Sequence, residues 1–134
     1  MSAEEVRQNM ATEGWTRVST PAGRYEYQFQ GRTPAVRNGQ YQDAADYQFL
    51  LLDAEGWLYR IPVRVAAEAE TELKRAGSSA GEVVEVIRVA AAQLRAGLQK
   101  FQPRQNAPFE ELDEFFAVDL ARARELCVQN DRAT

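Results

Sequence analysis

The chain has 134 residues, 45% of them hydrophobic, and a net charge of −4, which is typical of one globular domain that can build its own core. No apolar run is long enough to cross a membrane, and residues 1–10 lack the apolar centre of a signal peptide. The single cysteine excludes an internal disulfide and favours a reducing compartment, so we expect a cytoplasmic protein. The absence of histidine removes the commonest general base and zinc ligand.

The first quarter of the chain predicts a short helix and a hairpin. Ser2 and Glu5 have the spacing of a capping box, which predicts a helix within residues 1–14 that ends at Gly14. Two short runs then flank a turn that contains Pro and Gly, which predicts an antiparallel pair over residues 15–30. Residues 31–46 hold few apolar positions, and we expect a long irregular loop there.

Residues 47–65 predict a second hairpin, the centre of the domain. In residues 56–65 apolar and polar side chains alternate strictly, as they do in a half-buried strand. Trp57, Tyr59, Ile61, Val63 and Val65 form its apolar face. The proline at position 62 cannot donate to a ladder, so we expect an edge strand or a proline at a non-bonded position. Residues 15–65 are thus expected to form a four-stranded antiparallel sheet.

Residues 66–129 predict three helices. The first covers residues 66–76, and a second capping box opens a longer helix that runs to residue 101 with an apolar stripe at 3.6-residue spacing. The last is expected over residues 108–128, and residues 130–134 as a frayed tail. The predicted fold is a single α+β domain over residues 1–134. It has two layers: a four-stranded antiparallel sheet, preceded by a short helix and followed by three helices packed mainly on one face.

The sequence offers no catalytic or metal-binding motif. No phosphate-binding loop, dinucleotide fingerprint or nucleophile elbow is present. Cys127 lies on the apolar stripe of the last helix without a histidine partner, so we interpret it as a structural residue rather than a nucleophile. The acid pairs Asp43/Asp46 and Asp53/Glu55 fall in expected turns and match no calcium loop. We therefore expect no enzyme activity, no cofactor and no metal.

Arginine side chains provide one candidate binding surface. Residues 15–40 carry four arginines against one acid, in a chain that is acidic as a whole. Arginines and aromatic residues on an open sheet face can hold single-stranded nucleic acid or an acidic partner, although charged outer faces are also ordinary for such sheets. The candidate residues are Arg17, Arg24, Arg32, Arg37, Arg60 and Arg64.

The apolar face of the last helix provides a second candidate surface. Phe115, Val118 and Leu126 make it broader than one neighbouring element needs, so we expect an interface between two copies of the chain. The leading hypothesis is a non-enzymatic cytoplasmic binding protein that acts through protein–protein contacts as a homodimer, in a chaperone, inhibitor or regulatory-subunit role. The alternative is a single-stranded nucleic-acid-binding domain that uses the arginine surface.

Overall fold

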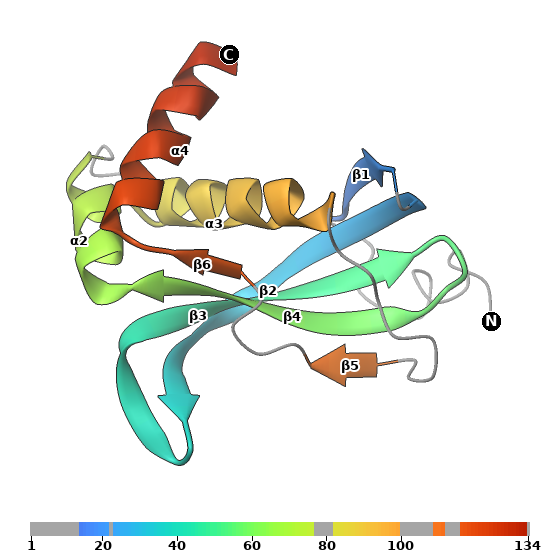
Figure 1. Cartoon of the computed structure of the whole chain (residues 1–134), viewed down its shortest axis with the longest axis horizontal. Helices are drawn as coiled ribbons and strands as arrows, with labels where there is room; N and C mark the ends of the chain where they lie inside the picture. The colour runs from blue at the N-terminus through green and yellow to red at the C-terminus, as the bar shows by residue number, and fades with distance from the viewer. Residues whose placement is uncertain (1–13, 22, 77–81, 100–108, 112–115, 134) are drawn as a thin grey trace.

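In a computed structural model, the described residues form a mixed sheet of six strands with three helices against it (Figure 1). The structure describes residues 14–21, 23–76, 82–99, 109–111 and 116–133, so the helix expected within residues 1–14 lies outside it. The strands are β1 (Thr16–Thr20), β2 (Gly23–Arg37), β3 (Gln40–Asp53), β4 (Leu58–Ala66), β5 (Phe109–Glu111) and β6 (Phe116–Val118). The helices are α2 (Ala67–Ala76), α3 (Glu82–Leu98) and α4 (Leu120–Ala133).

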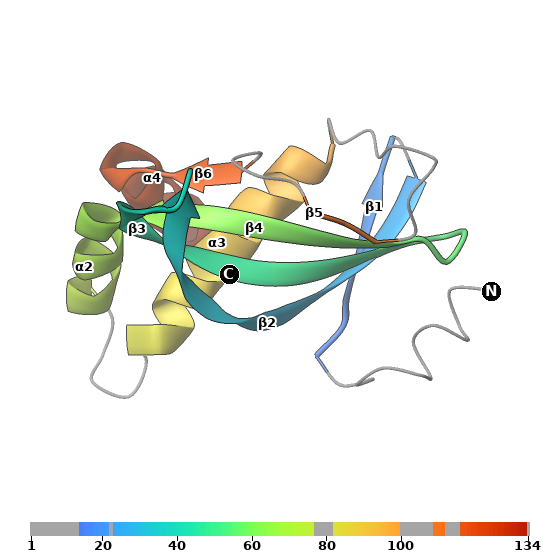
Figure 2. The ribbon, with the colours of Figure 1, turned by 90° about the horizontal axis from the view of Figure 1, so that it is seen from below.

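Strands β1 to β4 form an antiparallel meander in sequence order. The long strands β2, β3 and β4 bend together, so the sheet is curled rather than flat (Figure 2). The turn between β3 and β4 forms as predicted: Gly56 has a φ of 93°, and the Asp53 carboxylate accepts hydrogen bonds from the backbone N–H of Glu55 and of Trp57, both at 2.9 Å. This carboxylate therefore orders a turn.

The prediction of a purely antiparallel, four-stranded sheet was wrong. Strand β4 pairs with β5 and with β6 in parallel on the side away from β3, so it is no edge strand. The first half of the helix expected over residues 108–128 holds these two short strands, and α4 starts only at Leu120. Pro62, which has no backbone N–H, is accommodated in β4 because it lies between the two parallel pairings: β5 ends opposite Arg60 and β6 begins opposite Val63.

The irregular loop expected over residues 31–46 was also wrong. Strands β2 and β3 continue through it and close at a two-residue turn, in which Arg37 is paired with Gln40. Asn38 and Gly39 both have positive φ, 53° and 76°, the conformation of the tight hairpin turn that Asn-Gly favours. The polar composition of this segment therefore belongs to an exposed hairpin.

An irregularity in β2 decides which side chains face the helices. Phe29 pairs with Phe49, but the next aligned pair is Gly31 with Gln48, so Gln30 is an extra residue. A one-residue bulge exchanges the two faces for everything that follows it. Arg32 consequently lies on the same face as Phe29 and meets helix α2.

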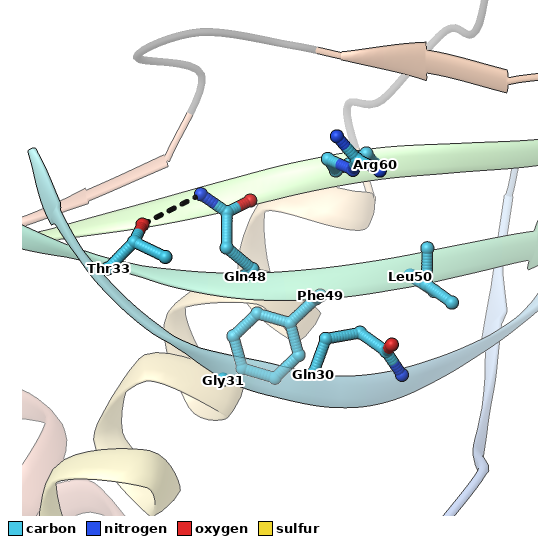
Figure 3. Close-up of a pocket in the computed structure, with 7 residues that line it drawn as sticks. All are labelled: Gln30, Gly31, Thr33, Gln48, Phe49, Leu50 and Arg60. Atoms are coloured by element: carbon cyan, nitrogen blue, oxygen red, sulfur yellow. Dashed lines mark hydrogen bonds between the residues drawn. The ribbon is translucent and has the colours of Figure 1, made fainter. Parts of the chain in front are cut away.

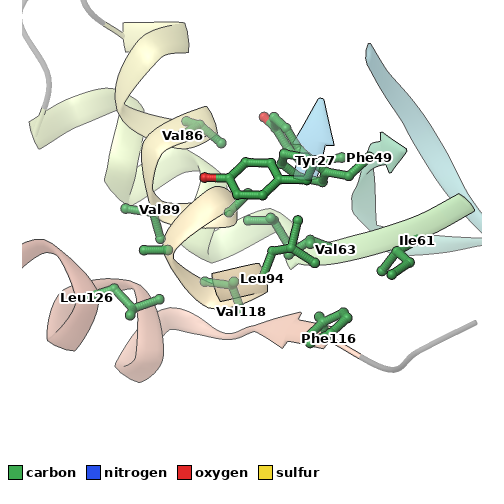
Figure 4. Close-up of a cluster of buried hydrophobic side chains, with 14 of the residues drawn as sticks. Tyr27, Phe49, Ile61, Val63, Val86, Val89, Leu94, Phe116, Val118 and Leu126 are labelled. Atoms are coloured by element: carbon green, nitrogen blue, oxygen red, sulfur yellow. The ribbon is translucent and has the colours of Figure 1, made fainter. Parts of the chain in front are cut away.

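The core lies between the aromatic face of the sheet and α3, as the alternation predicted. Tyr27, Phe49 and Tyr59 are almost fully buried there, and the rings of Tyr27 and Phe49, both labelled in Figure 4, meet edge to face at 5.8 Å. Strand β6, at the β4 edge of the sheet, and α4 also pack against α3. Helix α3 contributes Val86, Val89, Ala90, Leu94 and Leu98. Within the described residues, none of the helices is both long enough and apolar enough for a membrane span.

Candidate binding surfaces

Arg32 of the candidate arginine surface is bound within the chain. Its guanidinium donates two hydrogen bonds to the Glu70 carboxylate, at 2.7 and 2.9 Å, and the Tyr47 hydroxyl donates a third at 2.6 Å. Lys74 lies 3.7 Å from the same carboxylate, one helical turn along α2. Glu70 is only 8% exposed, so this network fastens the end of β2 to α2.

Protonation equilibria of the network reflect these contacts. The hydrogen bonds from Arg32 outweigh burial and lower the pKa of Glu70 below its ordinary value. Burial and the neighbouring Glu70 carboxylate raise the pKa of Tyr47. Glu70 is therefore ionised and Tyr47 is protonated at neutral pH, which is the pairing that the hydrogen bonds need.

Arg64 is likewise bound within the chain. It faces Asp46 across β3 and β4 and donates two hydrogen bonds to that carboxylate, at 2.9 and 3.0 Å. Asp46 is 7% exposed, so this is a half-buried structural ion pair. Arg17 lies 3.9 Å from Glu26 on the neighbouring strand.

Only part of the predicted arginine surface is brought together. Arg17, Arg24 and Arg60 lie on the sheet face opposite α3, as the alternation predicts. The bulge places Arg32 on the other face, and Arg37 lies at the tip of the β2–β3 hairpin. The six candidates do not form one surface.

The candidate oligomer interface is mostly inside the chain. Val118 in β6 is 1% exposed and Leu126 in α4 is 3% exposed, and both belong to the core. Phe115 lies outside the described residues. Packing within one chain therefore accounts for the apolar character of Val118 and Leu126 without a second copy.

The surroundings of the Cys127 side chain are those of a structural residue. The Cys127 thiol lies 3.2 Å from the Glu85 carboxylate, and its side chain packs against the core. Burial favours a higher pKa for Glu85, but hydrogen bonds from Arg88 and Cys127 outweigh it and lower the pKa. Among the described residues, no group of His, Cys, Asp or Glu side chains is arranged to hold a metal ion.

The sheet face opposite α3 is hollowed by a cavity of about 330 Å³, which we call the trough. Gln30, Gly31 and Thr33 line it from β2, Gln48 and Leu50 from β3, and Arg60 from β4 (Figure 3). Gln48 donates a hydrogen bond to Thr33 Oγ1 at 3.3 Å. Gln30 donates one to the Gln28 side chain. The trough is thus lined by two hydrogen-bonded side-chain amides beside Leu50, which is itself buried.

The tip of the β2–β3 hairpin, residues 36–43, forms an arm that extends beyond the rest of the sheet (Figure 1). The last residue of β4, Ala66, pairs with Ala44, so beyond this point the arm has only two strands among the described residues. Val36 is 45% exposed and Tyr41 is 80% exposed, and they are the only large exposed apolar side chains in the described ranges. They are also paired with each other across the arm.

A second cavity, of about 280 Å³, lies at the base of the arm, and we call it the socket. Its apolar lining comes from Ala44 in β3, from Ala66 at the end of β4, and from Ala117 and Val118 in β6. Asp43 and Asp119 lie at its edge. Asp119 also accepts a hydrogen bond from the Arg122 backbone N–H at 2.7 Å and so begins α4.

Sequence reasoning missed the arm, although a local signal for it exists. Asn-Gly between two extended segments is the strongest short-range indication of a tight hairpin. Val36 and Tyr41 lie at equal distances on either side of Asn38-Gly39, which is the spacing of a cross-strand pair. The socket has no comparable signal, because its residues come from three separate segments.

The described fold is a curled mixed sheet with helices on one face, and its open features include the arm, the socket, the trough and a smaller hollow of about 150 Å³ beside Arg17 and Arg24. No family model matches the chain, and neither the curated proteins nor the solved structures contain a similar one. The function is therefore inferred from this chain's own surfaces.

Proposed function

We propose that the protein is a non-enzymatic binding protein that acts through protein–protein contacts, and that it forms a homodimer in which each arm occupies the other copy's socket. The observation that carries the proposal is the exposed Val36–Tyr41 pair at the end of the arm. Aromatic side chains at protein interfaces contribute large contact area and are common hot spots. A reducing cytoplasm suits the single cysteine.

The socket has room for a side chain of the arm, and two acidic residues lie at its edge beside Arg64, which is itself paired with Asp46. Its alanine lining leaves room for a large side chain, and its volume of about 280 Å³ exceeds what one aromatic ring needs. Arg37 at the arm tip has the opposite charge to Asp43 and Asp119 at the socket edge. A second copy is therefore a fitting occupant, because every copy carries both halves of the contact.

The positions of arm and socket also allow a closed pair. Ala44 lies three positions after Tyr41, a distance of roughly 10 Å along a strand. Two arms that cross side by side in opposite directions would each place their tip at the other's base. Such an isologous contact closes on itself and predicts a dimer rather than a filament.

Sedimentation velocity over a range of protein concentrations tests the proposal. We expect a monomer–dimer equilibrium in the wild-type protein and at least about tenfold weaker association in Tyr41→Ser. Glu55→Ser, in the exposed turn between β3 and β4, is the matched control and should leave association unchanged. A wild-type chain that stays monomeric throughout, or a Tyr41→Ser variant that associates as well as the wild type, contradicts the proposal.

Charge exchange tests the register of the contact. Arg37→Glu and Asp43→Lys should each weaken dimerisation, and the double variant should recover much of the loss because the pairs are complementary again. Arg75→Glu, on exposed α2, controls for the change in net charge. Equal weakening by Arg75→Glu would show a general charge effect and remove the specific arm–socket contact.

We give the single-stranded nucleic-acid alternative second place. Arg32 and Arg64 already hold the buried carboxylates Glu70 and Asp46, so binding through them would break two structural ion pairs. The alternative predicts binding of a single-stranded oligonucleotide that weakens steeply with salt and drops in Arg60→Ala. The absence of such binding at low salt would end it.

A further inference from the structure

The arm leaves the body of the sheet at a bend. Between the pairs Pro34–Ala45 and Val36–Tyr41, one residue of β2 lies opposite three residues of β3. An irregularity of this kind bends a strand pair at one place. Ala35, the single residue of β2 in this stretch, is fully buried. Figure 1 shows the arm turned away from the direction in which β4 runs. The bend is therefore a packed part of the fold.

Two ion pairs hold the strands just before this bend, one on each face of the sheet. Arg32 binds Glu70 on the face that carries α2. Asp46 is paired with Arg64 on the opposite face, because Asp46 follows Ala45 and precedes Tyr47 in β3, and successive side chains of a strand alternate between faces. The root of the arm is thus held from both sides.

Both ion pairs have the geometry of a rigid contact. In each of them an arginine donates two hydrogen bonds to one carboxylate, at distances between 2.7 and 3.0 Å. A two-point contact of this kind fixes direction as well as distance. The carboxylates of Glu70 and Asp46 are nearly buried, so loss of either contact would leave a buried polar group without its charged partner. Each pair therefore resists movement of the arm.

The same two ion pairs connect the arm to the socket of its own chain. Helix α2 begins at Ala67, directly after Ala66, which lines the socket. Glu70, in the first turn of α2, accepts hydrogen bonds from Arg32 and from the Tyr47 hydroxyl. On the other face, Arg64 lines the socket as well. The direction of the arm is therefore set relative to the elements that form the socket.

We infer that Glu70 and Asp46 are positioning residues, which hold the arm in the direction needed to reach the socket of a second copy. This inference rests on the proposed dimer. A two-fold pair makes each contact twice, so both arms must stand at the same angle to their own sockets. An arm that already has this direction loses less conformational entropy on association. A loosened arm should associate more weakly, although Val36 and Tyr41 are intact.

Residual dipolar couplings of the backbone amides of residues 36–43 measure the direction of the arm. They are recorded by NMR in the Tyr41→Ser background, so that the result does not depend on association. We expect couplings that fit the same alignment as the body, and couplings that shrink when Glu70→Gln or Asp46→Asn is added. Glu85→Gln is the matched control, because it removes an arginine–carboxylate pair on α3. It should leave the couplings of the arm unchanged.

Sedimentation velocity of the same substitutions in chains that keep Tyr41 measures the effect on association. Glu70→Gln and Asp46→Asn should each weaken dimerisation about tenfold, and Glu85→Gln should not. Arg32→Lys keeps the charge but loses the two-point contact, so its association should lie between that of the wild type and that of Glu70→Gln. Asp46→Asn acts on the other face of the sheet, so it tests the inference even if Glu70→Gln fails to fold.

Two outcomes would overturn the inference. Arm couplings that stay the same in Glu70→Gln and Asp46→Asn would show that the ion pairs do not fix the arm, whether or not the chain dimerises. Looser arms with unchanged association would remove the positioning role. A wild-type chain that stays monomeric would instead contradict the proposed dimer, and the couplings would still decide whether the ion pairs hold the arm.

Discussion

Strands β2 and β3 pass through two different environments. In the body of the protein their inner face is covered by α3, and Tyr27, Phe49 and Leu51 are at most 4% exposed. In the arm, the same two strands carry Val36 and Tyr41 in solvent. Side chains of similar character are thus part of the core in one half of a single hairpin and part of the surface in the other.

Because of this difference, substitutions in the body should affect stability, and substitutions in the arm should affect binding. Residues of the body are fixed by many neighbours, so substitutions there should change the free energy of unfolding. Residues of the arm have few neighbours within the chain, so substitutions there should change association and leave the fold intact. The expected cost of a substitution should therefore fall from the tightly packed body to the loosely packed arm.

Gly97→Ala should have the largest effect. Alanine normally stabilises a helix relative to glycine by about 1 kcal/mol, but a Cβ at Gly97 would lie 1.7 Å from Cε1 and 2.3 Å from Cδ1 of Phe116. Phe116 is 1% exposed and cannot move aside freely. We expect a loss of about 3 kcal/mol in urea unfolding. Ala96→Gly, at the exposed neighbouring position, should cost about 1 kcal/mol. A Gly97→Ala variant as stable as wild type would contradict the close contact of α3 with β6.

Glu70→Gln should cost about 2 kcal/mol at neutral pH, because Arg32 and Tyr47 lose a charged acceptor. The folded-state pKa of Glu70 is lowered. Its contribution to stability is therefore fully present above the ordinary glutamate pKa, about 4.3, and is lost as the pH falls through the folded-state pKa. The difference in stability between wild type and variant should shrink in acid. Glu68 is exposed on the same helix, so Glu68→Gln should show neither effect. A stability difference between wild type and Glu70→Gln that stays constant across this pH range would argue against the network.

The alternation of residues 57–65 and the stripe of α3 could be predicted because each reports directly on one buried face. Strands β5 and β6 could not, since each has three residues and owes its conformation to pairing with β4. The segment around them is rich in acids and phenylalanines, which also suits a helix. The local sequence pattern there was therefore consistent with the helix that was wrongly predicted.

The candidate sites were harder to predict than the core. The face on which Arg32 lies depends on the bulge at Gln30, and its partner Glu70 is 38 residues away. The trough combines residues of three strands, so its shape follows from register rather than from any local motif. Only the arm had a readable signal, the Asn38-Gly39 turn.

Gly39→Ala should have a smaller effect, about 1 kcal/mol, because it strains the turn of the arm. Gly39 has a φ of 76°, a conformation that costs residues with a Cβ roughly this amount. Nothing lies within 4 Å of an added Cβ, so the cost is conformational rather than steric crowding by neighbours. Asn38→Gly keeps the turn and should be near neutral. Thermal unfolding of both variants and of the wild type, each diluted below the concentration range of self-association, measures the difference in stability. A Gly39→Ala variant as stable as the wild type would argue against the tight turn.

Tyr41→Ser should have the smallest effect on the isolated chain, within about 0.5 kcal/mol, because its side chain is 80% exposed. Leu51→Ala, in the covered part of the same strand, should cost about 2–5 kcal/mol. Association stabilises the folded state in proportion to the logarithm of concentration, so the wild-type melting temperature should rise with protein concentration. That of Tyr41→Ser should rise much less. If Tyr41→Ser destabilised the dilute chain as strongly as Leu51→Ala, the arm would be part of the folded core, and its separation from the body would be lost.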